Sequence, residues 1–178
     1  MDLKFKCVHF SELTVYELYS IMALRQEVFV VEQNCPYLDA DGKDLAGFHL
    51  LGYVDLGGNA QNTEGSFDVG FGQLSDVGFV PTPNTLLAYT RLLPKGVAYA
   101  DYASIGRVIN APKVRGKGVG KVLMEESIRQ MARLFPDNSV KIGAQSYLLR
   151  FYTALGFEST GEEYLEDDIP HTSMILKK

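Results

Sequence analysis

The stretch KVRGKGVGK, residues 113–121, joins positive charge to bare backbone. It holds four cations and three glycines in nine positions, within a chain whose formal net charge is −5. It lies between the apolar strand pattern SIGRVI and a helical pattern that runs to Phe135, so we expect a strand-to-helix turn. No Ser, Thr, Asp or Asn stands at the expected N-cap, and the first amides of a helix lack internal partners and carry about half a positive charge. The turn is therefore suited to bind an anion.

A pyrophosphate matches this turn best. Glycines have no Cβ to hold a phosphate away from the backbone, and the cations supply an attractive field. The ATP P-loop pattern fails, because it needs glycine where Arg115 stands and Ser or Thr where Val122 stands. The dinucleotide pattern G-x-G-x-x-G fails because Lys121 occupies its third glycine position. The alternative without a ligand is a solvated turn. The residues concerned are Lys113, Arg115, Gly116, Lys117, Gly118, Gly120 and Lys121.

The stretch resembles the [RQ]-x-x-G-x-G signature of the GNAT N-acetyltransferases, which Arg115, Gly118 and Gly120 satisfy. In that family the turn holds the pyrophosphate of acetyl-CoA. The family pattern N-x-x-A-x-x-F-Y-x-x-x-G-F has its counterpart in QSYLLRFYTALGF. There Gln145 replaces Asn and Leu148 replaces Ala, whereas the FY and GF pairs match.

Three further stretches, LRQEVFVVEQNCPYLDADGKD, IGRVI and DDIPH, resemble the ElaA-like subgroup of bacterial GNAT proteins. The likeness covers nearly the whole chain except residues 56–84, which look foreign to that subgroup. We expect a single acetyltransferase domain over residues 1–178. An inserted loop or hairpin should occupy 56–84, where the tetrapeptide DVGF occurs twice.

The resemblance implies how the site would be arranged. Acetyl-CoA, the expected co-substrate, would lie between the strands of SIGRVI and SVKIGA, with the N–H of Val108 or a neighbour facing the thioester oxygen. Tyr152 would protonate the departing thiolate, whereas without the resemblance it would be taken for a core tyrosine. The expected cofactor-binding residues are Val108, Ile109, Arg115, Gly116, Lys117, Gly118, Val119, Gly120, Lys121, Gln145 and Tyr152.

An amine acceptor must lose a proton before it attacks. At pH 7 a lysine-like amine with a pKa of about 10.4 is neutral about once in 2,500 molecules, and an α-amino group roughly one time in ten. A general base therefore matters most for the lysine-like class. His49 and Glu32 are the candidates. His49 is otherwise a strand histidine whose hydrogen bonds are satisfied, which is the favoured interpretation. Glu32 ends the first helix, where the family commonly builds its acceptor site.

Carboxylates raise two further possibilities. Asp39, Asp41 and Asp44 suggest calcium, but an EF-hand needs glycine sixth and glutamate twelfth, and here glycine is fourth and Leu50 twelfth. We therefore expect no metal, and the three aspartates form either a capped turn or a wall of the acceptor pocket. An acidic turn near the end of the chain is either solvated or attracts a cationic acceptor, and His171 beside it carries no role on its own. That turn comprises Glu162, Glu163, Glu166, Asp167 and Asp168.

Composition limits the class of protein. A chain of 178 residues with 46% hydrophobic and 22% charged residues is typical of one soluble globular domain. The pI near 5.2 argues against nucleic acid as a partner. The sequence has no signal-peptide pattern and no apolar run near the ~20 residues of a membrane span. We expect a cytoplasmic protein with free thiols at Cys7 and Cys35, and the sequence leaves a homodimer open.

The elements that must position these residues follow from periodicity. LKFKCVHF predicts a first strand, and Thr14 with Glu17 three residues later predicts a capped helix to Gln33. A second helix follows the glycine-rich turn, and a third over 146–157 should end in a Gly156 cap. Further strands are expected at 47–55, 85–93, 99–110, 139–144, 156–167 and 171–178. This order predicts a GNAT-type α/β (α+β) fold: a mixed, mostly antiparallel twisted sheet with a central parallel βαβ unit and helices on both faces.

Two classes of function remain. The first is an acetyl-CoA-dependent N-acetyltransferase that acts on a primary amine of a small molecule or protein, by direct attack in a ternary complex. The alternative is a non-catalytic module that binds or senses acetyl-CoA. Both keep the phosphate loop, and they differ at Tyr152. A third possibility makes residues 56–84 a segment for partner binding or dimerisation.

Overall fold

The computed structural model describes residues 3–54 and 86–178. The insertion predicted at 56–84 and its DVGF repeats lie outside the described residues, so the insertion stays a prediction.

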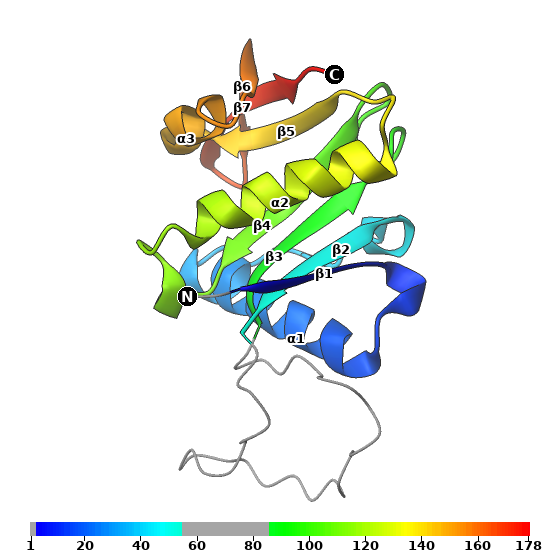
Figure 1. The fold of residues 1–178 in the computed structure, drawn as a ribbon. Coiled ribbons are helices and arrows are strands. Elements are labelled where there is room, and N and C mark those ends of the chain that lie inside the picture. Colours follow the sequence, from blue (N-terminus) through cyan, green and yellow to red (C-terminus); the bar gives the residue numbers. More distant parts are fainter. Residues whose placement is uncertain (1–2, 55–85) are drawn as a thin grey trace, which may run out of the picture.

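One mixed β-sheet organises the fold (Figure 1). In the described part of the chain it has seven strands in the order β1-β2-β3-β4-β5-β7-β6. All neighbouring pairs are antiparallel except β4 and β5, which are parallel and joined through helix α2. The predicted sheet, with its central parallel βαβ unit, is therefore confirmed. The strands are β1 Lys4–His9, β2 Phe48–Tyr53, β3 Leu86–Leu93, β4 Ala103–Asn110, β5 Val140–Gln145, β6 Glu158–Glu166 and β7 Ile169–Leu176.

Helices α1 (Val15–Arg25) and α2 (Val119–Leu134) cover opposite faces of this sheet (Figure 1). Consecutive side chains of a strand point to opposite faces, and two neighbours in β3 show the division. The Thr90 hydroxyl lies 2.9 Å from that of Ser127 in α2. Tyr89 points the other way, toward Arg25 of α1. Both faces are thus covered, as the sequence predicted.

The first helix begins as expected and then changes pitch. The Glu17 amide donates to Thr14 Oγ1 at 3.2 Å and the Thr14 amide donates to Glu17 Oε2 at 2.9 Å, which is the predicted capping box. After Arg25 the chain continues as a π-helix over Gln26–Glu32. The extent predicted for this helix is right, but its last turns are wider than an α-helix. Such segments are frequent at functional sites.

Short helical segments complete the fold. The predicted third helix is shorter than expected: α3 covers Leu149–Thr153 and follows a 3₁₀ turn at Ser146–Leu148. The other 3₁₀ turns are Phe10–Glu12, Lys43–Ala46 and Pro112–Val114. In the described part of the chain no helix is long and apolar enough to cross a membrane.

The end of α3 has the predicted glycine cap. Gly156 has φ +94°, its amide donates to the Thr153 carbonyl at 3.0 Å, and the Phe157 amide donates to the Tyr152 carbonyl at 3.1 Å. This pair of bonds is a Schellman motif. It fixes Phe157, which is 1% exposed, in the core beside Tyr152.

Replacing this glycine tests the cap. G156A should lower the free energy of unfolding by about 1–2 kcal/mol, because an L-residue is strained at this φ. A further loss is expected because the new Cβ would lie 3.2 Å from Leu176 Cδ1. G96A is the matched control, since Gly96 has φ +90° and open space around a Cβ. Urea unfolding of both variants gives the comparison. A loss in G156A no larger than in G96A would contradict a contribution from Leu176.

Candidate functional site

An opening in the sheet lies between β4 and β5. The two strands pair only at their starts, where Ala103 lies opposite Val140 and Ser104 opposite Lys141. Beyond this point β4 follows β3 and β5 follows β7, so the strands diverge (Figure 1). A cavity of about 690 Å³ fills the gap, within the usual range for a small-molecule site.

A β-bulge in β4 shapes one wall of this cavity. The register places Tyr89 opposite Ile109 but Arg91 opposite Gly106, so Arg107 and Val108 have no counterpart on β3. Arg107 has φ +53°, a conformation that costs a residue with a side chain of order 1–3 kcal/mol. Bulges of this kind redirect a side chain, and the contacts of Arg107 explain how this one is held.

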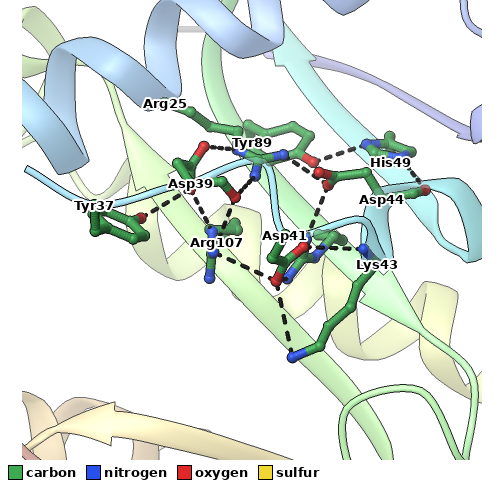
Figure 2. Close-up of polar contacts among 10 residues, drawn as sticks. Arg25, Tyr37, Asp39, Asp41, Lys43, Asp44, His49, Tyr89 and Arg107 are labelled. Carbon is green, nitrogen blue, oxygen red and sulfur yellow. Dashed lines mark hydrogen bonds and ion pairs between the residues drawn. The ribbon is translucent and has the colours of Figure 1, made fainter. Parts of the chain in front are cut away.

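Arg107 is held by Asp39, in the loop after the first helix (Figure 2). Its Nε donates to Asp39 Oδ1 at 2.7 Å and its Nη2 to the Asp39 carbonyl at 3.2 Å. The guanidinium also lies 5.8 Å from the ring centroids of Phe29 and Tyr37, which suits a cation–π contact. The loop, the π-helical segment and the bulge are thereby fixed to one another.

Two more arginines complete this cluster, which we call the arginine–aspartate network (Figure 2). Arg25 is fully buried and donates to Asp39 Oδ2 and Asp44 Oδ1, both at 2.7 Å. Arg91 donates to both carboxylate oxygens of Asp41, at 2.7 and 2.9 Å, and to Asp44 Oδ1 at 3.0 Å. The network consists of Arg25, Asp39, Asp41, Asp44, Arg91 and Arg107.

The network bears on two interpretations that the sequence raised. The three aspartates that suggested calcium bind arginines instead, and in residues 3–54 and 86–178 no group of three His, Cys, Asp or Glu could hold a metal ion. His49 is fully buried, with Nε2 3.1 Å from the Asp44 carbonyl and Nδ1 2.8 Å from the Tyr89 hydroxyl. Burial lowers its pKa, and it does not line the cavity. Its placement favours a satisfied strand histidine over a proton relay.

The glycine-rich turn opens α2 as predicted. Gly118 is the N-cap with φ +78°, no side chain caps the helix, and its first turn has no acidic residue. Positions 116 and 118 favour glycine because of their positive φ. Crowding is not the reason, since a Cβ added at either position would meet open space. Gly120 has another reason: its Cβ would lie 2.8 Å from Asn110 Nδ2. This glycine lets α2 pack against the end of β4, which differs from the expected role of admitting a phosphate.

Three of the four cations of the turn, Arg115, Lys117 and Lys121, fall into two groups. Arg115 holds Glu32 in a two-pronged ion pair, with Nη2 2.8 Å from Oε2, and its Nε donates to the Asn110 carbonyl at 3.1 Å. This hydrogen bond from Arg115 lowers the pKa of Glu32, which makes Glu32 a weaker base than expected. Lys117 donates to a backbone carbonyl at 3.0 Å. Lys121 is 68% exposed, and its Nζ lies 3.7 Å from Oε1 of the half-exposed Glu125. The two lysines are therefore the more available charges for a phosphate.

Tyr152 lies where α3 meets the cavity. It is 6% exposed, its ring packs edge-on against Phe151 and Phe157, and burial raises its pKa to about 12. Its hydroxyl has no hydrogen-bond partner among the described residues, so it remains a proton donor for a group in the cavity. Gln145, at the end of β5, lines the same cavity.

Comparison with known proteins decides the family. The family model for an acetyltransferase (GNAT) domain matches residues 84–178. Protein ElaA of Escherichia coli is 39% identical over 169 residues, which are 94% of this chain and 92% of that protein. The chain belongs to the GNAT acetyltransferase family.

Solved structures of GNAT proteins agree with this assignment. An acyl-CoA N-acyltransferase from Pseudomonas aeruginosa has a TM-score of 0.79 at 37% identity, covering 99% of this chain and 100% of that one. E. coli ElaA has a TM-score of 0.78 at 34% identity in the structural alignment, with the same coverage. The predicted family and its ElaA-like subgroup are confirmed. GNAT membership supports an acyltransferase that uses acetyl-CoA or another acyl-CoA.

The structure brings most of the predicted GNAT site residues together. Val108, Ile109, Arg115, Gln145 and Tyr152 line the cavity. The rest of the predicted cofactor set lies at the start of α2, next to Arg115, and consists of Gly116, Lys117, Gly118, Val119, Gly120 and Lys121. Their roles stay predictions.

Two cavity residues gave weaker signals in the sequence. Arg107 is a charged residue inside an apolar strand pattern, and that break was the available sign of a bulge. His171 also lines the cavity. It stands in the DDIPH stretch that resembles relatives, but nothing local distinguished it from His49.

The network gives a testable dependence on pH. Burial alone would raise the pKa of Asp41, but the hydrogen bonds and charge of Arg91 outweigh it and lower that pKa to about 2. An unfolded aspartate has a pKa near 3.9, so the unfolded chain binds the proton more readily. The stability from Asp41 is therefore present above about pH 4 and is lost as the pH falls toward 2.

D41N should lower the free energy of unfolding at pH 7 by about 1–3 kcal/mol, because it weakens the partner of a buried arginine. Its stability should also fall less steeply than that of the wild type between pH 4 and 2. Urea unfolding across this range measures both effects. D101N, at an aspartate whose side chain is 79% exposed, is the control and should follow the wild type. A D41N curve parallel to the wild type would refute the assignment.

Proposed function

We propose that the protein is an acetyl-CoA-dependent N-acetyltransferase that acetylates a primary amine of a small molecule or peptide. One observation carries this proposal. Arg115, three residues before the N-cap of the uncapped helix α2, and Tyr152 of α3 both line the cavity between β4 and β5, so a single extended ligand could reach Tyr152 and the start of α2. GNAT membership supplies the class of donor.

The chain's own groups fit such a donor. The amides at the start of α2, with Lys117 and Lys121, would hold the pyrophosphate, since a helix start favours anions. The edge of β4 that faces the gap would pair with the pantetheine arm, because β5 pairs with β4 only at Ala103 and Ser104. The N–H of Val108 would then donate to the thioester oxygen as negative charge develops there, an effect typically worth a few kcal/mol.

Tyr152 would complete the transfer. The bound donor supplies an electrophilic thioester carbonyl carbon, which the acceptor amine attacks directly within a ternary complex. A tyrosine with an ordinary pKa near 10 already keeps its proton at neutral pH, and burial raises the pKa of Tyr152 to about 12. The hydroxyl therefore holds a proton that it can donate to the leaving sulfur. Glu32 would hold Arg115 beside the turn, a positioning role that replaces the role of base expected for it.

Removing charge from the turn tests phosphate binding. The double variant K117A/K121A should raise the KM for acetyl-CoA at least tenfold, and this penalty should shrink as salt increases. Its turnover of acetyl-pantetheine, which has no phosphate, should stay at the wild-type level. K177A, at a lysine that follows the end of β7 and is 69% exposed, is the control. Equal loss with both donors would contradict phosphate binding at this turn.

Tyr152 separates the enzyme from the alternative, a non-catalytic acetyl-CoA sensor. Y152F should lower kcat about 100-fold or more, in line with the loss of general acid catalysis, while the Kd for CoA changes less than twofold. Thiol release with a panel of amines and calorimetry with CoA measure the two quantities. The sensor becomes the better description if wild-type protein binds CoA yet releases no thiol above background with any amine.

A further inference from the structure

His171 lines the cavity but has no part in the chemistry described above. It lies in β7, opposite Gln145 of β5 on one side and Tyr164 of β6 on the other. It is 9% exposed, so its ring is largely enclosed by the protein while one edge still borders the cavity.

The hydrogen bond at one ring nitrogen fixes the state of the other. Nδ1 lies 2.8 Å from the carbonyl oxygen of Ile169. A carbonyl oxygen can only accept, so Nδ1 carries the hydrogen and Nε2 of the neutral ring is a proton acceptor. Within the described residues no hydrogen bond occupies Nε2. The ring is also held by stacking on Tyr164, with centroids 5.7 Å apart and planes 22° apart.

His49 shows what a purely structural histidine looks like in this chain. Both of its ring nitrogens have partners inside the protein, it is fully buried, and it does not line the cavity. His171 differs on all three points. One of its ring nitrogens is open, it is 9% exposed rather than fully buried, and it lines the cavity. The open nitrogen needs a partner from the ligand or from water.

Charges near His171 suit a cationic amine. Glu166 and Asp167, from the end of β6 and the following turn, line the same cavity and form no ion pair in the described part of the chain. The arginines in the cavity wall are all paired: Arg91 and Arg107 with aspartates, and Arg115 with Glu32. Lys43 Nζ lies 3.9 Å from Asp41 Oδ2. The uncompensated charge on this side of the cavity is therefore negative.

We propose that His171 is the general base that removes a proton from the acceptor, and that Glu166 and Asp167 attract this acceptor as an ammonium ion. The proposal rests on the acetyltransferase function proposed above. It assigns the substrate class as amines that are protonated at neutral pH, and it gives the role of base to a residue other than His49 or Glu32.

The protons balance over one turnover. A proton passes from the ammonium nitrogen to His171 Nε2, and the neutral amine then forms a bond to the thioester carbonyl carbon. As the carbon–sulfur bond breaks, the sulfur takes the Tyr152 proton. The new amide nitrogen gives up its second proton, which returns to Tyr152 through water, and His171 releases its proton to solvent. The products are the amide, the free thiol and one proton.

The experiment compares acceptors of different basicity. At pH 7.5, H171Q should lose at least 100-fold in turnover with lysine-like amines, as expected for a lost general base. With anilines, which are already neutral at this pH, the loss should stay below about fivefold, because they need no deprotonation before attack. Adding imidazole to H171A should restore activity with lysine-like amines. H9Q, at a histidine on β1 across the sheet, is the control and should match the wild type.

Two further measurements keep the outcomes distinct. The variant E166Q/D167N should raise the KM for cationic amines and leave that for anilines unchanged, and unaltered CoA binding by H171Q would show that the variant is folded. Equal losses with both amine classes, without rescue by imidazole, would overturn the role of His171 and leave the acetyltransferase intact. Wild-type protein inactive with every amine would instead overturn the acetyltransferase function, and this proposal with it.

Discussion

The shape of the site depends on how Asp39 binds two arginines at once. Arg25 from the first helix and Arg107 from the β4 bulge both donate to its carboxylate and to its carbonyl oxygen. These bonds hold Arg107 in a backbone conformation that a residue with a side chain seldom adopts. The bulge in turn leaves part of β4 without a partner on β3, beside the gap where β5 turns away. A single carboxylate thus connects the first helix, the loop and the strand that forms the wall of the cavity.

The parts of the fold that the sequence predicted well are those set by nearby residues. The capping box at Thr14 and the glycine cap at Gly156 each involve partners within five residues, and both were found where expected. The central parallel pair also followed from local patterns, because a glycine-rich turn between an apolar strand and a helix implies a parallel unit. Local sequence patterns predicted the lengths and the pitch of the helices less well. They did not distinguish the π-helix at Gln26–Glu32 from an α-helix, since the two periodicities barely separate over two turns.

The cavity wall formed by the arginine–aspartate network and His171 could not be predicted in the same way, because its contacts join distant parts of the chain. Arg107 and Asp39 are 68 residues apart, and Arg91 and Asp41 are 50 apart. Nothing in the sequence pairs these charges, so the aspartates first suggested a metal site. The two histidines illustrate the same limit. His49 and His171 both stand in strands, and only the surrounding contacts separate an enclosed ring from one with an open nitrogen. The glycine-rich turn can therefore be predicted from a sequence motif, whereas the arginine–aspartate network and the environment of His171 depend on tertiary packing.

The balanced charges of the arginine–aspartate network limit how this protein can diversify. A substitution that removes one buried charge of the network leaves its partner ionised, buried and unpaired. The loss of one partner from a buried ion pair is strongly destabilising. That wall is therefore closed to gradual variation. The rim of the cavity is less constrained. Leu38 and Tyr147 line the cavity, but they are 80% and 77% exposed, and substituting them leaves no buried charge without a partner. Among relatives of this chain we therefore expect the residues at the rim to vary first. Residues of the arginine–aspartate network should change only together.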